Sequence, residues 1–376
     1  MLLDKTQDIG QPEISALGAI GLLKKVIKRA IAAVALVIFS LLIFEASVRI
    51  IAPQPLSVLN IYERHQRLPL YTLKPNCNAH VCTGETDWHA QTNNQGHRIP
   101  QRTGPPASPK ATVLVLGGTN TFGYGVDYEQ TYAGRIAADH PDLHIINAAV
   151  QGYGPVQYRM VLEDLIGQGL TPEMILVGVC PGVDYFHALA SKDLQPSDGC
   201  LPLGPTTWKS RLQKESHGYR LTSAIYHKLT TGSDPSESSL ERGLKIAEDW
   251  GRPPLAEARS RVKAEFHKIR QISEEAGAKL LFVLVPTADT ARDYRERLAT
   301  RQENPLPLTE QNTLAILEEL GLSSIDALTS IAAMPPGTTH HRFDRHVRSE
   351  AHAVIHNLLK ETTNQFTRMY SAHRTQ

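Results

Sequence analysis

The stretch VLVLGGTNTFGYGV, residues 113–126, carries the residue best placed for chemistry, Thr119. Apolar residues run into two glycines, a threonine and an asparagine, and a turn of this kind after a buried strand often bears a catalytic hydroxyl. A hydroxyl needs a base that takes its proton, and histidine is the usual base. The segment HHRFDRH at 340–346 carries three histidines and one aspartate. The two segments could form an acyl-transfer site if the fold brings them together.

The elements that must position these segments alternate along the chain from residue 111. Apolar runs predict five strands, at 112–118, 143–150, 174–180, 278–286 and 323–328. Helical spacing predicts helices at 129–140, 155–169, 256–277, 308–321 and 348–366. This order indicates an α/β fold, a three-layer sandwich with a mostly parallel five-stranded sheet. Turn formers at 185–255 interrupt it and predict an insertion with some helix near 237–250.

Function on an open α/β sheet lies at the carboxyl ends of the strands. Four segments of this chain qualify by that rule, namely 117–125, 151–157, 181–186 and 340–346. We therefore expect positions 119 and 346, far apart in sequence, to meet at one edge of the sheet.

These segments, in this order, resemble the SGNH (GDSL-type) hydrolase family over roughly residues 92–366. The first block of the family, GDS-x-T-x-G, corresponds to Gly117–Gly123, and its glycine block corresponds to NAAVQGYGPVQ with Gly152. The last block, D-x-H before the final helix, corresponds to Asp344-Arg345-His346. An apolar segment ending in E-x-x-x-R and followed by N-x-x-G-x-R is similar to a bacterial subgroup with an N-terminal anchor.

The resemblance implies a role for each matching residue. Thr119 would be the nucleophile, His346 its base and Asp344 the residue that orients the base. The backbone N–H groups of Gly152 and of the nucleophile turn would bind the oxyanion. It also implies oxyanion or substrate contacts for Gly118, Asn120 and Tyr153, and it implies no cofactor and no metal.

Three positions depart from the family pattern. Thr119 replaces the serine nucleophile, and Gly118 replaces the aspartate before it. In Pro181-Gly182-Val183-Asp184, Val183 replaces an asparagine that supplies an oxyanion-hole donor. The loss of one such donor typically costs about 10²–10³ in rate, and the methyl group of threonine crowds the attack path.

Each candidate residue also has a plain structural interpretation. Thr119 could cap the next helix, and the glycines could serve a tight strand-to-helix turn. Asp344 could cap the final helix beside a surface histidine. His352 and His356 lie four apart, a spacing that metal ligands use, but packing is the favoured interpretation of both.

The N-terminal segment predicts a single membrane anchor. Four basic residues at 24–29 precede Ala30–Phe44, fifteen residues without a charge. With the flank to Ile51 the run reaches the length of a span, if Arg49 reaches the interface. Basic residues before the segment favour a cytoplasmic N-terminus. A cleaved signal peptide and a buried soluble helix are the alternatives.

The four cysteines fit an exported domain, in which disulfides are common. Proximity in sequence pairs Cys77 with Cys82 and Cys180 with Cys200, although free thiols are the alternative. The net charge of +1 gives no reason to expect a nucleic-acid partner.

The predicted organisation is a cytoplasmic tail at 1–29, an anchor at 30–52, an irregular lead-in at 53–110 that packs on the domain, and an SGNH-like domain at 111–368. The predicted function is a periplasmic esterase or O-acyltransferase at the bacterial inner membrane, acting on an acyl ester of an envelope glycan or lipid-linked sugar. The alternative is a catalytically inactive relative that binds a glycan or an envelope protein.

Overall fold

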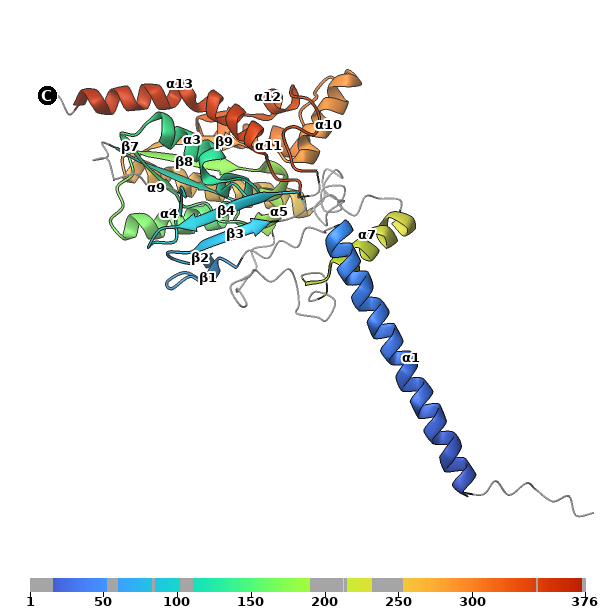
Figure 1. The fold of residues 1–376 in the computed structure, drawn as a ribbon. Helices are drawn as coiled ribbons and strands as arrows, with labels where there is room; N and C mark the ends of the chain where they lie inside the picture. Colours follow the sequence, from blue (N-terminus) through green and yellow to red (C-terminus); the bar gives the residue numbers. More distant parts are fainter. Residues whose placement is uncertain are drawn as a thin grey trace, which may run out of the picture.

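The computed structural model describes residues 16–52, 60–82, 85–101, 111–189, 212, 215–231, 253–342 and 344–373. Helix α1 (Ala16–Ile51) extends away from an α/β body that holds most of the other elements (Figure 1). Its segment Leu23–Ile51 has a mean hydropathy of 2.5 and is only 6% buried. By length and composition this helix can cross a membrane, and the expected anchor lies almost wholly inside it.

The central sheet has eight strands in the order β10-β9-β8-β6-β7-β5-β4-β3. Five neighbouring strands are mutually parallel, which confirms the predicted α/β sheet. They are β6 (Ala111–Gly117), β7 (Leu143–Asn147), β8 (Met174–Val179), β9 (Lys279–Leu284) and β10 (Ser324–Asp326). Gly117 pairs with Gly178, so β6 and β8 end side by side and the segments that follow them start together.

The lead-in is more regular than the sequence predicts. It adds antiparallel strands to the sheet and forms a separate hairpin of β1 with β2. The strands are β1 (Tyr62–Arg64), β2 (Tyr71–Leu73), β3 (Asn78–Cys82), β4 (Asp87–Thr92) and β5 (Arg98–Ile99). Such short strands with polar side chains lack the long apolar run that identifies a buried parallel strand.

Helices cover both faces of the sheet and give the three layers of the prediction (Figure 1). Alternate residues of β6 divide between two cores: Leu114 and Leu116 pack in one, and Val113 and Val115 in the other. The first core includes α4 (Pro155–Gly167), α5 (Pro181–Leu189), α9 (Pro253–Glu275) and α11 (Leu308–Glu319). The second includes α3 (Tyr132–Asp139), α10 (Ala288–Ala299), α12 (Leu328–Ala332) and α13 (Ser349–His373).

The predicted insertion at 185–255 is described only in part. Helix α5 runs into its beginning, and helix α7 (His217–Thr231) lies inside it. The helix expected near 237–250 lies outside the described residues. In Figure 1, α7 lies across the end of α1 that is nearer the body.

The predicted disulfides are absent at the described cysteines, because Cys77 and Cys180 are both free thiols. Cys77 precedes β3 and Cys82 ends it. Five residues of extended strand span about 16 Å, whereas a disulfide needs Cα atoms within about 7 Å. Nearness in sequence was therefore the wrong criterion for this pair. Cys200, the expected partner of Cys180, lies outside the described residues.

One buried cation joins the lead-in to the turn that follows β6. Arg98, in β5, is 1% exposed. Its guanidinium donates to the backbone carbonyls of Phe122, Gly123 (2.6 Å) and Val126 (2.6 Å), and to that of His89 (3.0 Å). It also lies 4.6 Å from the ring centre of Phe122, a cation–π distance. Burial lowers its pKa to about 10, so the group stays charged at neutral pH.

We expect Arg98→Met to lower the free energy of unfolding by at least about 3 kcal/mol, because it leaves several buried carbonyls without a donor. Denaturant unfolding of the full chain in detergent measures this. Arg64→Met is the matched control, since Arg64 is exposed, and it should change stability by less than about 0.5 kcal/mol. Equal effects of the two substitutions would contradict this account of Arg98.

Candidate active site

A cavity of about 330 Å³ lies at the carboxyl ends of the parallel strands. All four predicted segments reach it. Its lining includes Thr119 after β6, Tyr153 after β7, Val183 after β8, and Asp344 and His346 before α13. Positions 119 and 346, which we expect at one edge of the sheet, both line this cavity.

Thr119 is the first residue of the short helix α2 (Thr119–Phe122). Its hydroxyl oxygen accepts a hydrogen bond of 3.1 Å from the backbone N–H of Gly152. Gly152 has a φ of 79°, and a Cβ there would lie 2.6 Å from the hydroxyl oxygen of Tyr71. Position 152 therefore needs glycine for both conformation and space, and its N–H points at the candidate nucleophile.

The missing aspartate of the first block has a packing reason. A Cβ on Gly118 would lie 2.8 Å from the carbonyl oxygen of Tyr153 and 3.1 Å from the hydroxyl of Tyr158. The segment after β7 thus occupies the space that a side chain at position 118 would need. Gly118 lines the cavity with its backbone alone.

Asp344 and His346 form a hydrogen-bonded pair through Asp344 Oδ1 and His346 Nδ1. Arg345 between them has a φ of 71°, the left-handed conformation, and this turn brings the carboxylate back to the ring. Arg345 also pairs with Asp289 of α10. Burial raises the pKa of Asp344, but the charge and hydrogen bond of His346 outweigh it and hold that pKa below its usual value. The carboxylate is thus ionised and fixes Nδ1 as the protonated nitrogen.

Two residues that the sequence analysis missed support this pair. Glu85, in the lead-in, accepts hydrogen bonds from the backbone N–H groups of Arg342 and Asp344, the latter at 3.0 Å. The ring of Tyr124 packs on that of His346, with 4.8 Å between ring centres. Nothing in the sequence near Glu85 indicates this role, because the contact crosses more than 250 positions of the chain.

The structure contains no hydrogen bond between the Thr119 hydroxyl and the His346 imidazole. The Thr119 hydroxyl oxygen accepts from the Gly152 N–H, while Nδ1 of His346 is hydrogen-bonded to Asp344. In ligand-free enzymes the bond between nucleophile and base is often long and tightens when substrate binds. The arrangement can therefore supply a nucleophile, an oriented base and a nearby N–H donor at one cavity.

The Asn120 amide is already hydrogen-bonded to neighbouring segments, and Val183 has no side-chain donor. The Asn120 amide donates to the Cys180 thiol at 3.6 Å, and its oxygen accepts from the N–H of Val347 at 3.4 Å. These contacts tie the nucleophile turn to the segments after β8 and before α13. Val183 lines the cavity where the family pattern has a donor.

Tyr153 lines the cavity but uses its polar groups inside the protein. It is 2% exposed, and its hydroxyl donates to the carbonyl of Tyr71. Its own carbonyl lies within hydrogen-bond distance of the Tyr158 hydroxyl (3.2 Å) and of His187 Nδ1 (3.2 Å). The ring can therefore offer a substrate an apolar surface, while its hydroxyl is already bonded.

Asp184 is a buried acid that the sequence analysis named only as part of a motif. Its side chain accepts from the N–H of Cys180 at 3.0 Å and lies 3.0 Å from the Tyr158 hydroxyl. Burial raises its pKa to about 8, so it is mostly protonated at neutral pH. A protonated Asp184 can donate to Tyr158, whose hydroxyl then donates to the carbonyl of Tyr153.

The paired histidines of α13 contact separate neighbours. His352 Nδ1 accepts from the backbone N–H of Tyr132 at 3.3 Å, whereas His356 Nε2 lies 3.1 Å from Asp139. Within the described ranges, no three metal-ligating side chains form a group that could hold an ion.

Comparison with known proteins gives distant structural matches only. The sequence matches no protein-family model and no curated protein. A member of the lipolytic protein G-D-S-L family from Veillonella parvula is 13% identical, with 66% of this chain and 96% of that chain covered at a TM-score of 0.38. For the esterase EstA from Pseudoalteromonas sp., identity is 12%, coverage is 69% and 99%, and the TM-score is 0.39. A catalytic mutant of the acetylxylan esterase Axe2 from Geobacillus stearothermophilus is 10% identical, with 68% of this chain and 96% of that chain covered at a TM-score of 0.35.

Matches at these TM-scores decide neither the fold nor the activity of this chain. The fold follows from its own strand pairing, and the chemistry has to be argued from the cavity.

We expect the stability of the wild type to fall, relative to Asp184→Asn, as pH rises from about 5 to 7. The folded protein keeps a proton on Asp184 until about pH 8, whereas the unfolded chain loses it near pH 4. The folded state therefore binds one more proton in this window, and its stability falls by at most about 1.4 kcal/mol per pH unit. Denaturant unfolding of both chains at several pH values tests this, because groups common to both cancel. A pH-independent difference would mean that Asp184 is ionised in the folded protein.

Proposed function

We propose that this chain is a membrane-anchored ester hydrolase or O-acyltransferase with Thr119 as its nucleophile. The observation that carries the proposal is that Thr119, His346 and Asp344 line one cavity, with Asp344 bound to Nδ1 of the imidazole. This is the relation of nucleophile, base and orienting acid that acyl transfer needs. Fold alone would not be sufficient, because one fold hosts many activities.

In the first half-reaction, the Thr119 oxygen attacks the ester carbonyl while His346 Nε2 takes the hydroxyl proton. Asp344 stabilises the resulting imidazolium. The N–H of Gly152, which holds the hydroxyl oxygen in the free protein, and the N–H of Thr119 receive the developing oxyanion. The carbon–oxygen bond of the ester then breaks, the leaving alcohol takes the proton from His346, and the acyl group remains on Thr119.

In the second half-reaction, a second hydroxyl attacks the acyl-threonine. His346 takes its proton and returns it to Thr119 as the ester breaks. Water as the attacking group gives hydrolysis, and a sugar hydroxyl gives transfer. We propose an acyl ester of an envelope glycan or lipid-linked sugar as substrate, with α1 in the bacterial inner membrane and the α/β body in the periplasm.

A second candidate function is binding without turnover. Val183 supplies no hydrogen-bond donor to the cavity, and the Gly152 N–H is already bonded to Thr119. A protein with these features could hold a glycan or an envelope partner and leave the ester intact. Glycan-array binding by a wild-type chain that cleaves no ester would favour this candidate.

Ester cleavage by the full chain in detergent tests the catalytic proposal, with p-nitrophenyl acetate as substrate. We expect Thr119→Val, which keeps the shape and removes the hydroxyl, to lower kcat/KM at least about 10³-fold, and His346→Ala to do the same. Thr119→Ser should raise kcat, because it removes the methyl group that crowds the attack path. Wild-type cleavage that survives both Thr119→Val and His346→Ala would rule out the assignment.

A gain-of-function substitution tests the oxyanion side of the cavity. We expect Val183→Asn to raise kcat by up to about 10²-fold, because it adds a donor where the family pattern has one. Val183→Leu is the matched control, since leucine has nearly the same shape as asparagine but no N–H. A rise with leucine as large as that with asparagine would show that shape, and not the donor, causes the effect.

A further inference from the structure

Helix α7 begins against the end of α1, and one carboxylate joins the two helices. Glu45 accepts hydrogen bonds from the backbone N–H groups of His217 (3.0 Å) and Gly218 (2.8 Å) and from the Ser216 hydroxyl (2.7 Å). The first N–H groups of a helix lack acceptors within it, and negative charge is favourable there. Glu45 therefore caps α7 from another helix.

Arg49 and Gly218 complete this junction. Arg49 pairs with Glu45 at 2.7 Å and donates to the carbonyl of Glu215 at 2.9 Å. A Cβ on Gly218 would lie 2.8 Å from the ring of Phe44, so glycine lets the two helices approach. Of the two charges that interrupt the apolar run of α1, Glu45 thus contacts the first residues of α7 and Arg49 contacts Glu215, just before the helix.

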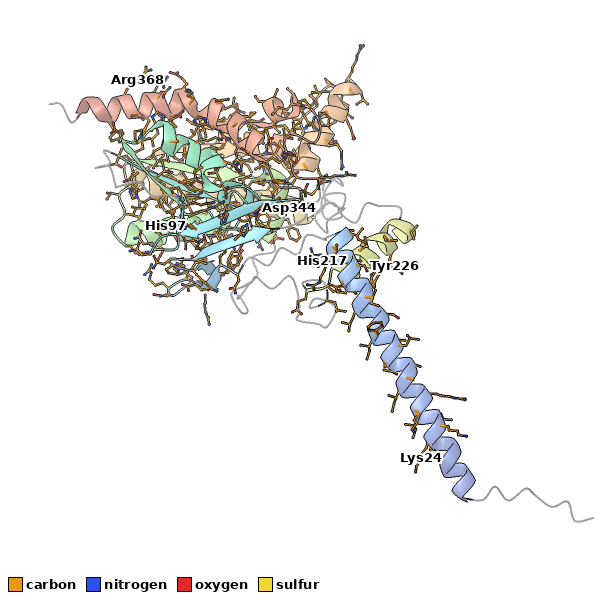
Figure 2. All side chains as sticks on the ribbon, in the orientation of Figure 1. Lys24, His97, His217, Tyr226, Asp344 and Arg368 are labelled. Carbon is orange, nitrogen blue, oxygen red and sulfur yellow. The ribbon has the colours of Figure 1, made fainter. Side chains whose placement is uncertain are left out.

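One side of α7 exposes three large apolar side chains. Ile225, Tyr226 and Leu229 are 49%, 65% and 80% exposed, and their spacing places them on one side of the helix. Figure 2 shows Tyr226 and His217 beside the end of α1. The last residues of α1, Ile50 and Ile51, are each 81% exposed. Apolar surface thus continues from α1 onto α7.

The opposite side of α7 bears Arg220. Arg220 lies near enough to Tyr124 for the two to interact electrostatically, and the ring of Tyr124 packs on that of His346. Asp344 lies on the side of the body that faces α7 (Figure 2).

We propose that α7 lies in the surface of the bilayer that α1 crosses, with Ile225, Tyr226 and Leu229 among the lipid headgroups and upper acyl chains. The occupant of this apolar face is the membrane, because Glu45 fixes the start of α7 to the last turns of the spanning helix. Helices of this kind bury their apolar face about 5–10 Å into the interface. The inference rests on the anchor in the proposed function and is independent of the catalytic activity.

Tryptophan quenching by brominated phospholipids tests this with the full chain in lipid nanodiscs. Leu229→Trp adds a reporter on the proposed lipid-facing side. Ser223→Trp adds one on a half-buried position that lies off this face, and Val37→Trp adds one inside the span. The fluorescence of the wild-type chain is subtracted from that of each variant. Trp88, which contributes to the wild-type fluorescence, is buried. Bromine near the headgroup should remove most of the added fluorescence at position 229 and little at 223, while bromine deep in the chains should quench position 37.

Quenching at 37 without quenching at 229 would overturn the inference, and so would two chains per disc that shield α7 from lipid. Absence of quenching at 37 would remove the anchor itself and the inference with it. Ile225→Trp repeats the test if Leu229→Trp does not fold. Ester cleavage by the same samples reports separately on the catalytic proposal, so failure of one is distinguishable from failure of the other.

Discussion

The guanidinium of Arg98 is the contact on which the geometry of the cavity depends. A buried cation is costly unless its donors are used, and here they bind carbonyls of the turn after β6 and of β4. That turn is rich in glycine and has little intrinsic rigidity. Arg98 fixes the end of the turn at 122–126, and the pairing of β6 with β8 fixes its beginning at Gly117. Thr119 lies between these two constraints, so its position follows from both.

The lead-in is therefore a structural part of the site. Its residue Arg98 holds the nucleophile turn, and its residue Glu85 holds the loop that bears Asp344 and His346. Tyr71 also belongs to the lead-in. The carbonyl of Tyr71 accepts a hydrogen bond from the Tyr153 hydroxyl, and the Tyr71 hydroxyl donates to the carbonyl of Gln151 at 2.7 Å. Each cavity segment that carries a candidate reacting group is thus tied to residues before β6. A truncation that begins at the first parallel strand would remove these ties together.

The sequence was informative where one local pattern determines the structure. Five apolar runs predicted the parallel strands, and the rule that sites lie at strand ends placed Thr119 and His346 at one cavity. The sequence was uninformative where the local structure depends on residues far away in the chain. The strands β3, β4 and β5 are short and largely polar, and they join the parallel strands only through the pairing of β5 with β7. The contact of Glu85 with Asp344 has no local pattern, and Cys77 and Cys82 are separated by the strand between them.

The charged residues that interrupt the apolar run of α1 lie where this helix meets α7. A charge within an apolar span is costly unless it is paired or reaches the interface. Glu45 and Arg49 are paired with each other. Glu45 also binds the first N–H groups of α7, and Arg49 binds the carbonyl of Glu215 just before it. Arg220 of α7 interacts electrostatically with Tyr124, whose ring packs on that of His346. If α7 lies in the bilayer surface, the base side of the cavity faces the membrane, because Asp344 lies on the side of the body that faces α7 (Figure 2). An acyl ester carried on a lipid would then reach Thr119 over a shorter distance than one carried on a distant glycan, and this favours the lipid-linked sugar of the two proposed substrates.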